Sequence, residues 1–207
     1  MPHVQQNYRL ILASGSRYRR DLLSRLRLPF ESIAPDIDEC ALKNELPEQT
    51  ALRLAEQKAV IIAKSHPNSI IIGSDQVATL EGEHIGKPGT HDAAFKQLQK
   101  MRGKSVIFHT ALCLIDNRLH SNVGQSAHLI QTENVQTLVG FRQLSDEELD
   151  AYLRIEQPYD CAGSAKNEGL GITIIEKIVS NDPTALTGLP LISLTNMLRN
   201  IGIFFYN

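Results

Sequence analysis

Three consecutive isoleucines at residues 70–72 constrain the fold more than any other stretch of the chain. A short, wholly apolar run of β-branched residues is typical of a central strand that is covered on both faces. Helices on the two sides of a sheet provide that cover, and the run therefore indicates an α/β fold. It leads directly into Gly73-Ser74-Asp75-Gln76, so the sequence predicts Asp75 at the end of a buried strand.

A second apolar run, at residues 10–13, is followed by the turn Ser14-Gly15-Ser16 and by an arginine-rich helical pattern. We expect a strand, a tight turn and a helix start that Ser14 and Ser16 can cap. The free N–H groups and the positive end of the helix dipole at such a turn attract anions. Arg19 and Arg20 add guanidinium donors that match phosphate oxygens in pairs. The turn is a candidate phosphate site, and the alternative is a solvated basic helix face.

The rest of the chain shows helical and strand patterns without an internal repeat. We expect helices over residues 47–64, 91–101 and 191–200, and another that begins at the capping box of Ser145. We expect strands over residues 30–34, 77–80, 83–85, 105–115, 119–133, 135–142 and 172–178, and a loop of small residues over 161–171. The 207 residues suffice for one domain, 1–207, with residues 1–7 as a flexible N-terminus.

The composition excludes several classes of protein. A net charge of −2 gives no general attraction to nucleic acid polymers or to acidic membranes. The three cysteines form no C-x-x-C pair, which argues against a disulfide framework and for a reducing compartment. No apolar segment reaches the length of a signal core or of a membrane span, so we expect a cytoplasmic protein.

Charged side chains follow several of the expected strands, and ligands of an open α/β sheet bind at such strand ends. Cations together with carboxylates suit a polyphosphate and a divalent metal, Mg²⁺ or Mn²⁺. In this interpretation Glu39 and Asp75 supply the oxygen ligands of the metal. The alternative is a set of surface salt bridges. The groups are Ser14, Arg19 and Arg20 after the first strand, Asp38 and Glu39 after the second, Asp75 after the third, and Lys87 after the hairpin.

Seven short motifs lie in order along almost the whole chain: LASGSRYRRDLL at residues 12–23, IDE at 37–39, RLAEQKA at 53–59, GSDQ at 73–76, GKP at 86–88, CAGS at 161–164 and GLPL at 188–191. Together they resemble the Maf family of nucleoside triphosphate pyrophosphatases, and the set is far more specific than any one motif alone. Tyr18, Gln76 and Glu168 look most like the bacterial subgroup that acts on 7-methyl-GTP.

The resemblance implies an α/β fold like that of the inosine triphosphate pyrophosphatases, with two lobes around a central mixed sheet, a cleft between them, and usually a homodimer. It implies hydrolysis of a nucleoside triphosphate between the α and β phosphates, with a divalent metal. The implied roles are phosphate binding for Ser14, Arg19, Lys58 and Lys87, metal binding for Glu39 and Asp75, and proton acceptance from water for Asp75. Arg20 either binds phosphate or braces the loop.

The chemistry of the base supports the implied substrate. Methylation at N7 gives guanine positive character, so the ring of Tyr18 could stack on it with a cation–π contribution of about 0.5–2 kcal/mol. The carboxylate of Glu168 can accept the adjacent N–H donors of guanine, whereas uracil or thymine would present acceptors to it. Gln76 would complete the pocket. Ala165 stands where the family usually carries an aromatic residue, which affects either the base pocket or a dimer contact.

Two other functions stay open at this point. One is a dTTP/UTP pyrophosphatase of the same family. The other is a nucleotide-binding regulator of cell division or septum formation that uses the same pocket without turnover. The joint presence of Glu39, Lys58, Asp75 and Lys87 favours catalysis, because binding alone does not require two carboxylates that could activate water.

Overall fold

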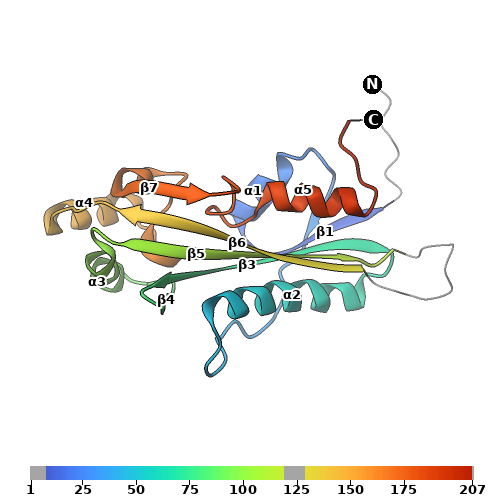
Figure 1. The fold of residues 1–207 in the computed structure, drawn as a ribbon, viewed down its shortest axis with the longest axis horizontal. Coiled ribbons are helices and arrows are strands. Elements are labelled where there is room, and N and C mark those ends of the chain that lie inside the picture. Colours follow the sequence, from blue (N-terminus) through green and yellow to red (C-terminus); the bar gives the residue numbers. More distant parts are fainter. Residues whose placement is uncertain (1–7, 119–128, 207) are drawn as a thin grey trace.

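The computed structural model describes residues 8–118 and 129–206, which form a mixed sheet flanked by helices (Figure 1). The strands follow the order β2-β1-β3-β5-β6-β7, and β4 pairs with β3 beside this path. The strands are β1 (Arg9–Ala13), β2 (Glu31–Ser32), β3 (Ser69–Leu80), β4 (Glu83–Ile85), β5 (Ser105–Asp116), β6 (Leu129–Phe141) and β7 (Ile175–Ser180). The α-helices are α1 (Arg17–Ser24), α2 (Pro47–Ser65), α3 (His91–Met101), α4 (Asp146–Glu156) and α5 (Leu191–Asn200), with 3₁₀ turns at Ala162–Ser164 and Leu170–Ile174.

The long strands β3, β5 and β6 connect the two ends of the molecule (Figure 1). At one end β3 runs parallel to β1, and at the other it runs antiparallel to β4. Helix α2 covers one face of the sheet beside β1 and α5 covers the other, whereas α3 and α4 lie at the opposite end (Figure 1). The expected α/β class, with two lobes around a mixed sheet, is confirmed.

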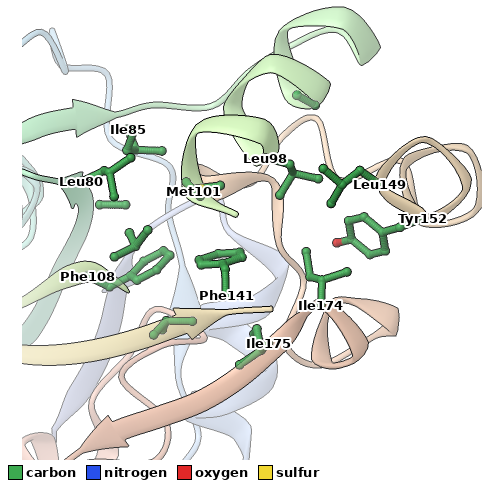
Figure 2. Close-up of a cluster of buried hydrophobic side chains, with 14 of the residues drawn as sticks. Leu80, Ile85, Leu98, Met101, Phe108, Phe141, Leu149, Tyr152, Ile174 and Ile175 are labelled. Atoms are coloured by element: carbon green, nitrogen blue, oxygen red, sulfur yellow. The ribbon is translucent and has the colours of Figure 1, made fainter. Parts of the chain in front are cut away.

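The isoleucine run behaves as its sequence predicts. Ile70 and Ile72 pack on one face of the sheet with side chains of α1 and α5, and Ile71 packs on the other face with α2. All three are fully buried, and each such side chain contributes about 1.5–3 kcal/mol of hydrophobic stabilisation. A separate core holds the other end together, where Phe108 and Phe141 of the sheet face Leu98 and Leu149 of α3 and α4 (Figure 2).

The helix predictions are confirmed, including the capping box in which Ser145 and Glu148 exchange hydrogen bonds. None of the helices in the described ranges is long and apolar enough to cross a membrane.

Six strand predictions differ from the structure. Asp75 does not lie at the end of a strand, because β5 pairs with β3 continuously from Ile70 to Thr79 and merges the expected strands 70–72 and 77–80. Strands 119–133 and 135–142 likewise form one strand, β6, which pairs with β5 from Leu129 to Gly140; residues 119–128 lie outside the described residues, as does the expected flexible segment 1–7. The strand over 30–34 shortens to β2, and 172–178 shifts to β7 behind a 3₁₀ turn.

Candidate active site

A cavity of about 860 Å³ is lined by residues of α1, α2 and β3 and by the loops that follow β4 and α4. Every predicted site residue except Arg20 and the exposed Asp38 lies in its wall: Ser14, Tyr18, Arg19, Glu39, Lys58, Asp75, Gln76, Lys87 and Glu168. Ala165 lines the cavity as well, and it also packs against the core shown in Figure 2. The departure at Ala165 therefore affects the pocket.

Lys58 joins the two predicted metal ligands. Its Nζ donates to Asp75 Oδ1 at 2.6 Å and lies 2.6 Å from Glu39 Oε1. The side chains of Lys58 and Asp75 are buried, whereas Glu39 is half-exposed. The sequence interpretation assigned Lys58 to phosphate, but the structure places its ammonium group between the carboxylates.

Electrostatic contacts keep the Glu39 carboxylate ionised. Burial alone would raise its pKa, but the hydrogen bond from Lys58 and the charges of Lys58, Lys87 and Arg19 lower it below the ordinary value. Lys87 itself is exposed on the loop after β4 and lines the cavity. The centre of the cavity therefore has negative carboxylates with a rim of cations.

Arg19 is held in the wall by neutral oxygen atoms. Its Nε donates to the carbonyl oxygen of Gly188 at 2.8 Å, and its Nη1 lies 3.4 Å from Ser14 Oγ. Burial lowers the pKa of Arg19, and the charges of Asp75 and Glu39 act in the opposite direction. Among the described residues no carboxylate forms an ion pair with this guanidinium. An anion in the cavity would supply the missing counter-charge.

The turn before α1 supports the same role. Ser16 caps the helix, with its Oγ accepting from the Arg19 N–H at 3.4 Å. The Ser14 hydroxyl accepts from the Ser16 N–H at 3.1 Å. The N-terminal end of α1 thus lies at the cavity wall beside Arg19. A helix N-terminus at this place is what a phosphate site requires.

Arg20 is not brought to the cavity. Its side chain is exposed, and it is not part of the cavity wall. Successive residues of an α-helix point about 100° apart, and this rotation leaves Arg20 outside the cavity that Tyr18 and Arg19 line.

Tyr18, Gln76 and Glu168 lie in the same cavity wall. Burial raises the pKa of Tyr18, and the charges of Asp160 and Glu168 act in the same direction, whereas the charge of Lys166 lowers it. The phenol and the Glu168 carboxylate are therefore electrostatic neighbours, although they are 150 positions apart in the chain. Glu168 is exposed on the loop between the two 3₁₀ turns.

Residues 182–190, here called the carbonyl loop, were not predicted as part of the site. The carbonyl oxygen of Gly188 accepts from Arg19 and from Ser74 Oγ, and those of Ala185 and Leu186 accept from Gln76 Nε2. Backbone carbonyl oxygens therefore hold the side chains of Arg19, Ser74 and Gln76. The sequence does not indicate which backbone carbonyl groups will accept such hydrogen bonds.

Asp182 and Thr184 hold the carbonyl loop in place. The buried Asp182 carboxylate accepts from the Thr184 hydroxyl at 2.8 Å and from the N–H of Ile192 at 2.7 Å at the start of α5. The signal for this arrangement is Asp182-Pro-Thr184, because an Asp two residues before a Thr can accept from its backbone N–H, as it does here at 3.0 Å.

The two carboxylates could bind a divalent metal whose remaining ligands come from a substrate. Within residues 8–118 and 129–206, no group of three His, Cys, Asp or Glu side chains is arranged to hold a metal alone. Mg²⁺ needs no such group, since one or two carboxylates plus phosphate oxygens and water commonly complete its shell. Lys58 is bonded to Oδ1 of Asp75, and no described residue donates a hydrogen bond to Oδ2. Glu39 and Asp75 therefore suit a metal that a nucleotide brings with it.

The comparisons with known proteins cover nearly the whole chain. The family model described as Maf-like protein matches residues 9–201. The 7-methyl-GTP pyrophosphatase of Ralstonia nicotianae is 61% identical over 93% of this chain and 95% of its own. The protein of the same name from Thiobacillus denitrificans is 53% identical over 94% of this chain and 92% of its own. The Staphylococcus aureus Ham1 protein aligns with a TM-score of 0.43 at 16% identity, covering 65% of this chain and 72% of that one.

Proposed function

Because the chain belongs to the Maf family, we propose that it hydrolyses 7-methyl-GTP between the α and β phosphates, giving 7-methyl-GMP and pyrophosphate. Such an enzyme removes modified nucleotides from the pool. The observation that carries the proposal is the joint position of Arg19 and the Glu39–Lys58–Asp75 cluster in one cavity: a half-buried cation that has no ion-pair partner among the described residues lies beside two carboxylates. The curated relatives with the name 7-methyl-GTP pyrophosphatase support the choice of substrate.

In this proposal, positive and polar groups of the cavity wall bind the phosphates. Arg19, Ser14 and Lys87 neutralise and orient the triphosphate, because hydrogen-bond donors that are fixed before the reaction stabilise charge that develops in the transition state. Lys58 holds the carboxylates of Glu39 and Asp75 in the same region through its two contacts of 2.6 Å. A water molecule attacks the phosphorus, the P–O bond between the α and β phosphates breaks, and Asp75 accepts the proton of the water.

The divalent cation, Mg²⁺ or Mn²⁺, belongs to this proposal. Glu39 and Asp75 would hold it, and it would supply positive charge against the phosphate oxygens.

Recognition of the base is assigned to Tyr18, Gln76 and Glu168. Tyr18 offers an aromatic face to the positively charged 7-methylguanine ring. Glu168 offers acceptors to the N–H groups of its Watson–Crick edge.

We further propose that the protein acts as a cytoplasmic homodimer, in line with the family. The three cysteines are all free thiols, which suits a reducing compartment. Light scattering on the purified protein should give twice the chain mass of 23.0 kDa, and a mass of one chain at micromolar concentration would contradict the dimer.

The proposal is tested by incubating the purified protein with 7-methyl-GTP, GTP, dTTP, UTP and CTP in Mg²⁺ or Mn²⁺ and measuring pyrophosphate. We expect 7-methyl-GTP to give the highest kcat/KM. A preference for dTTP and UTP would instead favour the alternative function, a dTTP/UTP pyrophosphatase of the same family. Binding without release of pyrophosphate from any nucleotide would favour a regulator.

Asp75→Asn tests the proton acceptor. The substitution keeps the shape of the side chain but removes its basicity, so kcat should fall by about 10²–10⁴-fold. Nucleotide affinity, measured by calorimetry, should change little. Turnover equal to the wild type would remove Asp75 from its role.

A further inference from the structure

Gln76 and Thr110 face each other on neighbouring strands. They are cross-strand partners of β3 and β5, and Gln76 Nε2 lies 2.9 Å from Thr110 Oγ1. Thr110 is fully buried, whereas Gln76 lines the cavity. The pair thus connects the base end of the cavity to the interior of the sheet.

The hydroxyl of Thr110 can only accept a hydrogen bond from Gln76. Its single proton is directed to the carbonyl oxygen of Ala185 at 3.0 Å, which leaves lone pairs for the Gln76 amide. Gln76 Nε2 also lies 3.1 Å from the carbonyl oxygen of Ala185 and 3.0 Å from that of Leu186. Three acceptors therefore surround a nitrogen that has two hydrogens.

This environment fixes which way the Gln76 amide points. Turning the amide over would place its oxygen against two carbonyl oxygens and a hydroxyl that has already donated its proton, so the reverse orientation is repelled. The amide oxygen Oε1 accepts no hydrogen bond from the described residues. Among the described residues, Asn134 Oδ1 is the one buried side-chain polar atom without a hydrogen-bond partner. Gln76 Oε1 also lacks a partner but is not such a buried atom, so it is open to the cavity.

We infer that Gln76 recognises the base as a hydrogen-bond acceptor, and that Thr110 is a positioning residue that holds its amide in this orientation together with the carbonyl oxygens of Ala185 and Leu186. The inference rests on the proposed function and deepens it. An acceptor at this point selects an exocyclic amino group, such as the 2-amino group of 7-methylguanine, one of whose hydrogens would bind Gln76 and the other Glu168. It disfavours bases that present a carbonyl oxygen there.

The test compares 7-methyl-GTP with 7-methyl-ITP, which lacks the amino group. Wild-type protein should favour 7-methyl-GTP by about tenfold or more in kcat/KM, because the analogue offers no amino hydrogens to the acceptors of Gln76 and Glu168. Thr110→Val removes the hydroxyl at nearly constant shape and should reduce this ratio by about 3- to 10-fold. Thr110→Ser keeps the hydroxyl and should retain the wild-type ratio.

Gln76→Leu gives a second measurement that does not depend on the buried threonine. It should lower the ratio at least as far as Thr110→Val, with the remainder due to Glu168. Thermal unfolding of each variant separates loss of folding from loss of selection.

Equal use of the two nucleotides by the wild type would overturn the inference while leaving the pyrophosphatase in place. An unchanged ratio in Thr110→Val, or an equal loss in Thr110→Ser, would overturn the role of Thr110. Dissociation constants for the same two nucleotides give the same comparison if turnover is absent, a result that by itself contradicts only the proposed function.

Discussion

At the scale of single residues, the site depends on one lysine that neutralises two carboxylates. Lys58 Nζ lies 2.6 Å from an oxygen of each. Without it, Glu39 and Asp75 would face each other with their negative charges less compensated, and the hydrogen bond that lowers the Glu39 pKa would be lost. Lys58 is therefore best understood as the group that pairs with both carboxylates and keeps Glu39 ionised.

Lys58→Met should reduce kcat/KM for 7-methyl-GTP by at least about 100-fold, the usual cost of removing one electrostatic partner from an active site. The acid limb of the pH–rate profile should also move to higher pH, because the Glu39 pKa returns toward its ordinary value. Lys104→Met is the matched control, since Lys104 pairs with Glu81 on the surface at 3.0 Å. Equal activity of Lys58→Met and this control would contradict the role of Lys58.

Which arginine serves the site was not predictable from residue type. Arg19 and Arg20 are adjacent and chemically the same, and only the rotation of α1 directs Arg19 to Gly188. The long-range contacts of Gln76 are equally hidden, because two of its three acceptors are backbone carbonyl oxygens of the carbonyl loop. The sequence identified nine side chains of the wall, but not the atoms that hold them.

At the scale of elements, the position of α2 on β3 places Lys58 at Asp75. Gly73 allows the close approach: a Cβ atom at this position would lie 2.2 Å from the carbonyl oxygen of Ala55 and 3.0 Å from Ala59 Cβ. The glycine therefore sets the distance between helix and strand. The sequence showed both elements, but their spacing depends on this contact between distant segments.

Gly73→Ala should displace α2 and lower the free energy of unfolding by about 1–3 kcal/mol. Activity should fall further than this instability explains, because Lys58 moves with the helix. Gly140→Ala is the matched control in the same sheet, where the nearest atom to the added Cβ, Lys177 Cβ, lies at an ordinary 3.6 Å. Chemical denaturation and kcat/KM measure both effects; a Gly73→Ala protein with wild-type values would contradict the tight contact.

The segment that carries Glu39 is anchored to α2 by another ion pair. Arg53 donates to both oxygens of Glu45 and, at 3.0 Å, to the carbonyl oxygen of Cys40. The hydrogen bond from Arg53 lowers the pKa of Glu45 to about 2. A carboxylate with a lowered pKa stabilises the fold above its unfolded pKa, and that stabilisation disappears as the pH falls through its folded pKa.

Glu45→Gln should therefore unfold at a lower temperature than the wild type at neutral pH, and the difference should shrink as the pH falls from about 4.5 toward 2. Thermal unfolding followed by circular dichroism across this range gives the comparison. A difference that stays constant with pH would show that the charge of Glu45 is not what anchors the segment.

At the scale of the whole molecule, the three long strands belong to both ends of the fold. β3, β5 and β6 contribute Ile72 and Leu112 to one core and Phe108 and Val139 to the other. The lengths of β3 and β6 were not predicted, because they arise from mutual pairing rather than from local pattern, whereas the prediction of a strand over 105–115 is confirmed by β5. That pairing also explains why Asp75 lies in the middle of a strand.

Shared strands predict that the chain unfolds as one cooperative unit. Near-ultraviolet and far-ultraviolet circular dichroism should give coincident transitions, and the calorimetric and van't Hoff enthalpies should agree. Two separate transitions would show that the two ends fold independently, against the expectation of a single domain.

The central claim is that water cleaves the bond between the α and β phosphates of a nucleotide in this cavity. ³¹P NMR of a reaction with 7-methyl-GTP and Mg²⁺ distinguishes the products directly. The account predicts resonances of 7-methyl-GMP and pyrophosphate in equal amounts, which Asp75→Asn forms far more slowly. Formation of 7-methyl-GDP and inorganic phosphate, or wild-type rates in Asp75→Asn, would contradict it.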